Sequence, residues 1–184
     1  VTVNTDDDWI LVTSVNTPLT KNGNGTMTIT PGKIAGNLII NSGTVKNSTA
    51  NTNTSLIGSN TFTLNADGNY IGTGYFYKMM IYGTMNMLRV NGTTPATYKL
   101  ENSLDLKSGG KLVFNIASGT SYSQITQGTS SSSSLTLSAN STIEVALGEA
   151  YEPKAGDTFT LWTVGSFAAS KTANIVLPTL PAGC

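Results

Sequence analysis

The sequence predicts an all-β protein and, within that class, a single right-handed parallel β-helix, also called a β-solenoid. Charged residues make up only 11 % of the 184 residues, less than half the usual share of about 25 %. Ser, Thr, Asn and Gly supply the polarity instead. Thr and β-branched apolar residues suit strands, whereas Gly and Asn suit tight corners. The residues that favour helices never cluster along the chain.

Short apolar segments separated by small residues recur along the whole chain. Thr26 to Thr30 alternates with period two, as a half-buried strand does. The strand cores are often three or four residues long, which favours coils stacked on one another. A β-sandwich, whose strands recur every 8–12 residues or so, is the alternative. In chain order, we expect strands within 9–12, 26–30, 37–45, 61–64, 75–90, 104–106, 111–116, 134–137, 142–147, 157–164 and 174–177.

Asparagine recurs near the ends of these segments, where stacked coils would place like residues on like. This pattern also favours the solenoid over the sandwich. We read the chain as one module, residues 1–184, without a domain boundary. The asparagines in question are Asn37, Asn41, Asn65, Asn91, Asn115, Asn140 and Asn174.

The last part of the chain has a distinctive order of segments. Gly156 to Leu161 reads Gly-Asp-Thr-Phe-Thr-Leu, and it lies among the segments 110–116, 122–125, 135–137, 143–145 and 177–183. This order, over residues 110–183, resembles β-helical modules of large secreted bacterial proteins. These include autotransporter-type passengers and carbohydrate-binding appendages of polysaccharide-degrading enzymes. The resemblance implies a secreted or cell-surface module excised from a longer chain, with Cys184 at a boundary.

Composition excludes several classes of function. Lysine plus arginine equals aspartate plus glutamate at 10 each, so no net field attracts nucleic acid or an anionic membrane. The apolar runs are far shorter than the roughly 20 residues of a membrane span. The chain has no histidine and one cysteine, which excludes Ser-His-Asp triads, histidine zinc sites and thiolate clusters. We therefore predict a protein that is not an enzyme.

The aromatic stretch from Tyr75 to Tyr82 is the strongest candidate for a binding surface. It holds four aromatic residues in eight positions. On a strand, Tyr75 and Tyr77 project from one face, while strict alternation puts Lys78 and Tyr82 on the other. All four share a surface only if the strand bends or bulges between them. With Arg89, these residues are the predicted sugar-binding set, because aromatic rings receive sugar rings while amides and charges bind hydroxyls. The alternative is that the aromatic residues fill the core.

Downstream of this stretch, the strand pattern predicts which side chains face the interior. Leu88 and Val90 are expected inside, which places Met85, Met87 and Arg89 outside.

Three aspartates suggest a metal site. Asp6 and Asp8 flank Asp7 and would share one side of a strand, and Asp67 precedes a Gly-Asn pair. Calcium takes six to eight oxygen ligands, many from carboxylates. The predicted cofactor is therefore none, or a structural calcium at Asp6, Asp8 or Asp67. The alternative is a solvated cap.

These observations together predict a carbohydrate-binding accessory module that recognises a xylan-like or β-glucan polysaccharide. Tethering to catalytic or anchoring domains is expected in the full-length bacterial protein. Two alternatives stay open. One is a structural spacer or adhesin stalk. The other is a polysaccharide lyase or glycoside hydrolase that uses carboxylates such as Glu144, Glu149, Glu152 and Asp157.

Overall fold

The computed structural model describes residues 1–11, 16–30, 34–47, 57–129 and 132–180. Within these ranges the chain forms fifteen strands in one sheet and no helix. The strands are β1 (Thr2–Asn4), β2 (Trp9–Leu11), β3 (Leu19–Asn22), β4 (Thr26–Ile29), β5 (Leu38–Asn47), β6 (Ile57–Gly72), β7 (Gly74–Ile81), β8 (Thr84–Asn86), β9 (Thr97–Leu106), β10 (Lys111–Ile116), β11 (Gln124–Gln127), β12 (Ser134–Leu137), β13 (Thr142–Leu147), β14 (Ser166–Ala169) and β15 (Asn174–Val176).

Every pairing between these strands is parallel, and the pairings form three ladders. The first ladder runs through β1, β3, β5, β6, β7, β9, β12 and β14. The second runs through β2, β4, β5, β6, β8, β10, β13 and β15. A shorter third ladder joins parts of β6, β7 and β9 to β11.

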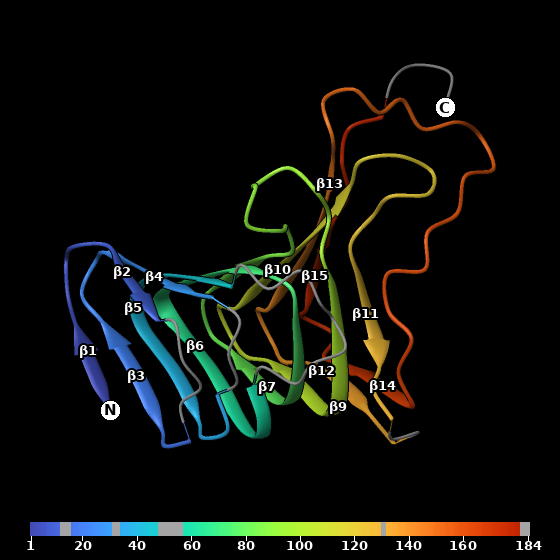
Figure 1. Ribbon diagram of the computed structural model, residues 1–184. Coiled ribbons are helices and arrows are strands. Elements are labelled where there is room, and N and C mark those ends of the chain that lie inside the picture. Colours follow the sequence, from blue (N-terminus) through green and yellow to red (C-terminus); the bar gives the residue numbers. More distant parts are fainter. Residues whose placement is uncertain (12–15, 31–33, 48–56, 130–131, 181–184) are drawn as a thin grey trace.

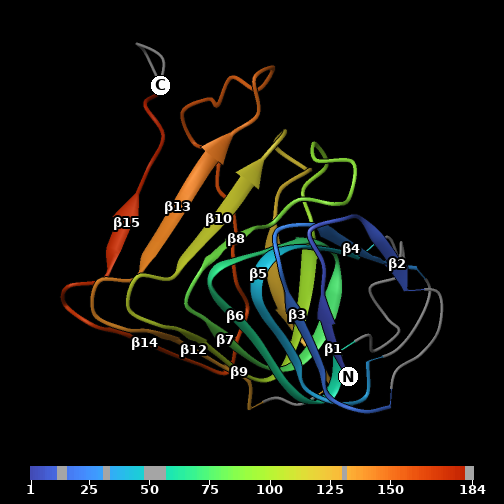
Figure 2. The ribbon, with the colours of Figure 1, turned by 90° about the vertical axis from the view of Figure 1, so that its left-hand side faces the viewer.

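The sheet curls because single strands pass from one ladder to the next (Figures 1 and 2). In β5, Leu38 to Ile40 belong to the first ladder, and Thr44 to Asn47 belong to the second. The result is an all-β, solenoid-like arrangement of parallel strands. Because a β-sandwich is built from antiparallel sheets, this pairing favours the solenoid over the sandwich.

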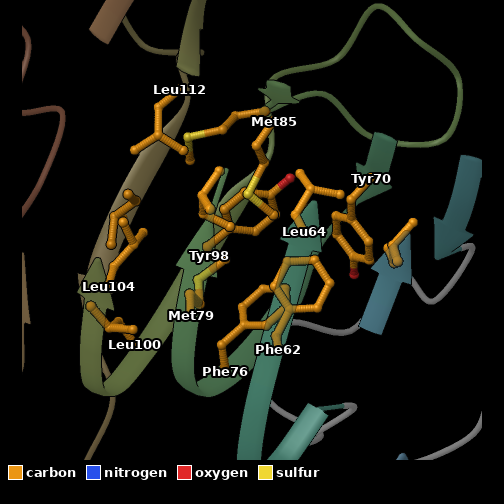
Figure 3. Packing of buried hydrophobic residues seen from close by; sticks show 14 of the residues in the cluster. Phe62, Leu64, Tyr70, Phe76, Met79, Met85, Tyr98, Leu100, Leu104 and Leu112 are labelled. Atoms are coloured by element: carbon orange, nitrogen blue, oxygen red, sulfur yellow. The ribbon is translucent and has the colours of Figure 1, made fainter. Parts of the chain in front are cut away.

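The interior of the curl is filled by side chains from alternate strand positions (Figure 3). Phe62, Tyr70, Phe76 and Tyr98 are fully buried. The Phe62 and Phe76 ring centroids lie 5.2 Å apart, and Phe76 meets Tyr98 edge to face at 5.5 Å. Such aromatic pairs add stabilisation beyond the area that they bury.

Asparagine side chains stack along one corner of the sheet, and the stack includes Asn41 and Asn65, two of the asparagines that the sequence predicts to stack. The Asn22 amide donates to Asn4 Oδ1 at 2.6 Å, Asn41 donates to Asn22 at 2.7 Å, and Asn65 donates to Asn41 at 2.6 Å. We call this set the asparagine column. Each middle member both donates and accepts, so the column joins four consecutive strands of the first ladder.

Other asparagines differ in how far they follow the expected stacking of asparagine on asparagine between coils. Asn115 donates to Asn86 Oδ1 at 2.7 Å across β10 and β8, which is a second like-on-like pair. Asn91 instead accepts from the backbone amides of Thr93 and Thr94 within its own loop. Asn140 occupies a left-handed backbone conformation, with φ of 57°.

Glycines in the turns between the first and second ladders let neighbouring turns approach closely. A Cβ on Gly110 would lie 2.2 Å from the Ile81 carbonyl oxygen. Gly43 has φ of +72°, and a Cβ there would lie 2.3 Å from the Gly23 carbonyl oxygen. Both positions therefore require glycine, one for space and one also for backbone conformation.

Lys21 is a charged exception inside the curl. It stands directly beside the buried Ile40 and is itself 0 % exposed. Its ammonium donates to the carbonyl oxygens of Asn22 and Gly23, each at 2.7 Å. Burial lowers the pKa of the Lys21 ammonium, and Asp6 opposes that shift. Backbone carbonyls in the turn therefore solvate this ammonium in place of water.

Candidate functional site

The inward and outward alternation of β7 breaks at Tyr77 and Lys78, which brings both side chains onto the outer surface. The register with β9 shifts at the same point, because two β9 residues, Glu101 and Asn102, lie opposite Tyr77. Phe76 and Met79 are fully buried, whereas Tyr77 is 40 % exposed and Lys78 is half-buried. Two consecutive side chains, Tyr77 and Lys78, therefore both face outward. Such an irregularity in the strand is the condition under which the sequence predicts that the tyrosines and the lysine share a surface.

The outward residues of β6, β7 and β9 form one surface, which we call the tyrosine-flanked face. Tyr77 and Tyr82 lie at its two ends, with exposed fractions of 40 % and 36 %. Tyr82 lies five positions after Tyr77, so their Cα atoms are at most about 16 Å apart. The half-buried outward side chains between them are Thr61, Thr63, Lys78, Met80, Ser103 and Asp105.

This face is chemically mixed and close to neutral. Lys78 lies beside Ser103, and Met80 lies beside Asp105, in direct register across β7 and β9. Asp105 also pairs with Lys107 at 3.4 Å. Hydroxyls, one apolar side chain and balanced charges thus lie between two exposed phenol rings.

Tyr75 lies on the third ladder, next to Lys99 across β7 and β9. Its hydroxyl donates to the Glu101 carboxylate. That carboxylate also accepts from the Thr129 backbone amide at 2.8 Å and from the Thr129 hydroxyl at 2.7 Å. Burial, followed by the hydrogen bond to Glu101, raises the pKa of the Tyr75 phenol. Tyr75 is therefore held in place more firmly than Tyr77, whose hydroxyl accepts from the Asn102 amide at 3.2 Å.

Arg89 does not join the tyrosine-flanked face. It is exposed on the loop between β8 and β9, where its backbone amide donates to the Thr94 carbonyl oxygen at 2.7 Å. The structure thus brings together Tyr77, Lys78 and Tyr82, with Tyr75 on the adjoining ladder.

The predicted orientation of the residues on either side of Arg89 is wrong. Met85 and Met87 are fully buried, whereas Leu88 and Val90 are half-buried. The inward positions established at Ile81 continue through Met85 and Met87. The same alternation turns Leu88 outward, and Val90 lies in the turn that follows. Flexible methionine side chains fill the interior as well as leucine does.

The three aspartates proposed for calcium do not form one cluster. Asp6 Oδ1 accepts from the Asn24 backbone amide at 2.7 Å, and Asp8 Oδ1 accepts from the Thr26 amide at 3.0 Å. Asp67 lies on β6, beside Ser42 of β5. Among the described residues, no group of three or more acidic, histidine or cysteine side chains is placed to hold a metal ion. Asp6 and Asp8 thus cap the turn of the neighbouring coil, and a calcium site stays a prediction.

The carboxylates that are close in sequence have separate surroundings. Glu144 on β13 forms an ion pair with Lys111 on β10. Asp157 accepts from the Tyr151 hydroxyl at 2.5 Å and from the Lys154 backbone amide at 2.8 Å. Glu149 and Glu152 are exposed in the connection after β13. The hydrogen bond to Asp157 raises the pKa of the Tyr151 phenol to about 12.

Several residues of the surface are absent from the sequence prediction. Thr61, Met80, Asn102 and Asp105 reach it only because β6, β7 and β9 pair in a particular register. Thr61 comes from β6, and Asn102 and Asp105 come from β9, so no local pattern marks them as neighbours of the β7 tyrosines.

Neither a known protein-family model nor a curated protein sequence matches this chain. Its class is therefore defined by the fold, which is an all-β, curled sheet of parallel, solenoid-like strands. Over the part of the chain that is described, no helix has the length and hydrophobicity to cross a membrane.

Proposed function

We propose that this chain is a carbohydrate-binding module built on a right-handed parallel β-helix. It binds a neutral plant-type polysaccharide, xylan-like or a β-glucan, and performs no catalysis. It serves as an accessory part of a larger secreted bacterial protein that carries catalytic or anchoring domains. The observation that supports this proposal best is the outward pair of tyrosines at the two ends of the tyrosine-flanked face.

The chemistry of the face suits an extended, uncharged glycan. A sugar ring presents a C–H face that covers the apolar surface of a phenol, and its hydroxyls need hydrogen-bond partners. Tyr77 and Tyr82 offer the rings, and Lys78, Ser103 and Asp105 offer the polar partners between them. A chain laid along β7 meets one ring at each end.

Calorimetry and affinity gels with xylan, β-glucan and mannan test this function. We expect the native chain to bind at least one of them. Tyr77→Ala and Tyr82→Ala should each weaken binding about tenfold, which corresponds to about 1.4 kcal/mol. Tyr151→Ala is the matched control, because it removes a tyrosine from the segment after β13 and leaves the tyrosine-flanked face intact.

The outcomes separate the candidate functions. Retention by no glycan overturns the binding function and favours a structural spacer. A spacer is supported by the asparagine column, which ties four consecutive strands into one rigid stack. Binding that both tyrosine variants leave unchanged would move the site off this face.

A further inference from the structure

A hollow of about 490 Å³ lies on the outer side of the second ladder, where β6 and β8 are neighbours. This volume lies within the range of roughly 300–1,000 Å³ that is common for small-molecule sites. Its apolar lining includes Ala66, Ile71 and Leu88. Its polar lining comes from Asp67, Asn69, Thr84 and Asn86.

The polar side chains of the hollow have unused hydrogen-bonding groups. Among the described residues, the side chains of Asp67, Asn69 and Thr84 make no hydrogen bond or ion pair. Asn86 uses its carbonyl oxygen to accept from Asn115 at 2.7 Å, which leaves its NH₂ group for another acceptor. Asn69 and Thr84 stand directly opposite each other across β6 and β8. Donors and acceptors therefore converge over an apolar patch.

The charge of the hollow selects the kind of ligand. Among the described residues that line it, Asp67 is the only charged one. A carboxylate repels an acidic ligand and accepts hydrogen bonds from hydroxyls. One carboxylate is too few for a calcium site, which needs six to eight oxygen ligands. The lining therefore fits a neutral polyhydroxylated ring better than a uronic acid or a metal ion.

The hollow adjoins one end of the tyrosine-flanked face. Tyr82 is followed by the buried corner Gly83 and then by Thr84, which lines the hollow. On the neighbouring strand, Asn65 of the asparagine column is followed by Ala66 and Asp67, which also line it. The two surfaces thus meet at the corner between the first and second ladders.

We infer that this hollow is a second sugar subsite, which takes one neutral sugar ring of a glycan whose chain continues over Tyr82. The inference rests on the proposed carbohydrate-binding function and names a further part of the same site. It predicts that long oligosaccharides bind more tightly than short ones, because only the long ones reach both the face and the hollow. It also predicts that acidic polymers bind less tightly than neutral ones, because the Asp67 carboxylate repels them.

The test measures binding of a xylose or glucose trimer and hexamer to the full chain by calorimetry. Thr84→Phe fills the hollow, and Thr142→Phe is the control because Thr142 is an outward, half-buried residue of the same ladder on β13. We expect Thr84→Phe to weaken hexamer binding roughly tenfold and to leave trimer binding unchanged. Asp67→Asn should reduce the preference for neutral xylan over polygalacturonate. Nuclear magnetic resonance of the Asn69 side-chain amide gives a direct readout, with a shift expected on hexamer addition.

The two proposals fail in different ways. If the native chain binds no glycan, the proposed function falls and the subsite falls with it. If the chain binds and Tyr77→Ala weakens that binding, the function stands. In that case an unchanged hexamer affinity in Thr84→Phe, together with an unmoved Asn69 amide signal, overturns the subsite alone. Thermal unfolding of each variant verifies that the fold is retained.

Discussion

The strands in the middle of the sheet and the last two strands, β14 and β15, all point alternate side chains inward. These inward side chains are buried in the middle of the sheet and exposed on the last two strands. Phe76 on β7 is 0 % exposed, whereas Phe167, an inward position of β14, is 48 % exposed. Leu112 and Ile143 are buried, yet Ile175, next in the same row on β15, is 61 % exposed. The middle strands have a neighbour on both sides, and β14 and β15 have a described neighbour on one side only. Burial in this fold thus depends on a stacked neighbour as well as on inward orientation.

The largest expected effect comes from truncating a phenylalanine in each region. Phe76→Ala should lower the free energy of unfolding by about 3–5 kcal/mol, because it leaves a cavity among packed rings. Phe167→Ala should cost about 1 kcal/mol, since its ring is half exposed and stacks mainly on Trp162. Urea unfolding followed by circular dichroism measures both. Equal losses would show that the two regions are packed alike.

The next largest difference in stability is expected between alanine substitutions of two glycines, one at a crowded corner and one in an open loop. Gly110→Ala should destabilise the fold by about 1–3 kcal/mol, because its Cβ overlaps the Ile81 carbonyl oxygen. Gly119→Ala, where a Cβ meets nothing within 4 Å, should change stability by less than about 0.5 kcal/mol. The same unfolding measurement compares them. A harmless Gly110→Ala would mean that adjacent turns separate readily.

Sequence reasoning predicts the local features of this fold better than its pairings. The strand class and the stacking of Asn41 on its neighbours follow from residue type. Alternation places Tyr75 and Tyr77 on one side of the strand and does not decide whether that side faces outward. The break in alternation at Lys78 does not follow from the sequence, because it depends on how β7 aligns with β9, which has one extra residue at that point. The interior position of Lys21 also escapes prediction, since only the folded turn supplies the carbonyls that solvate its ammonium. Site residues from distant segments are invisible until the register is known.

Two buried tyrosines of the middle region should respond differently to loss of the hydroxyl. The Tyr70 hydroxyl donates to the Thr73 carbonyl oxygen at 2.9 Å and accepts from the Asn47 amide. The Tyr98 hydroxyl has no partner among the described residues. Tyr70→Phe should therefore cost about 1–2 kcal/mol, whereas Tyr98→Phe should stabilise the fold by about 1 kcal/mol. A destabilised Tyr98→Phe would point to a partner for that hydroxyl, such as a buried water.

The same tyrosines make stability depend on alkaline pH. Burial raises the pKa of both phenols, so above about pH 10 the unfolded chain loses protons that the folded chain keeps. Stability should then fall by up to about 1.4 kcal/mol per pH unit for each tyrosine. Lys21, whose pKa is lowered, acts in the opposite direction below about pH 10.5. Urea unfolding from pH 9 to 12 should show a shallower decline in Tyr98→Phe, and an unchanged slope would contradict this assignment.

The smallest expected difference in stability between a middle strand and an end strand concerns the asparagine column. Asn41 donates to Asn22 and accepts from Asn65, whereas Asn4, at the end of the column, only accepts from Asn22. Asn41→Ala should cost about 1 kcal/mol, because two hydrogen bonds are lost and water replaces them only in part. Asn4→Ala should cost about half as much. Urea unfolding of the two single variants and the double variant tests whether the column acts as a unit. Because Asn22 bridges both sites, the two losses should not add, and strict additivity would mean that the column consists of independent pairs.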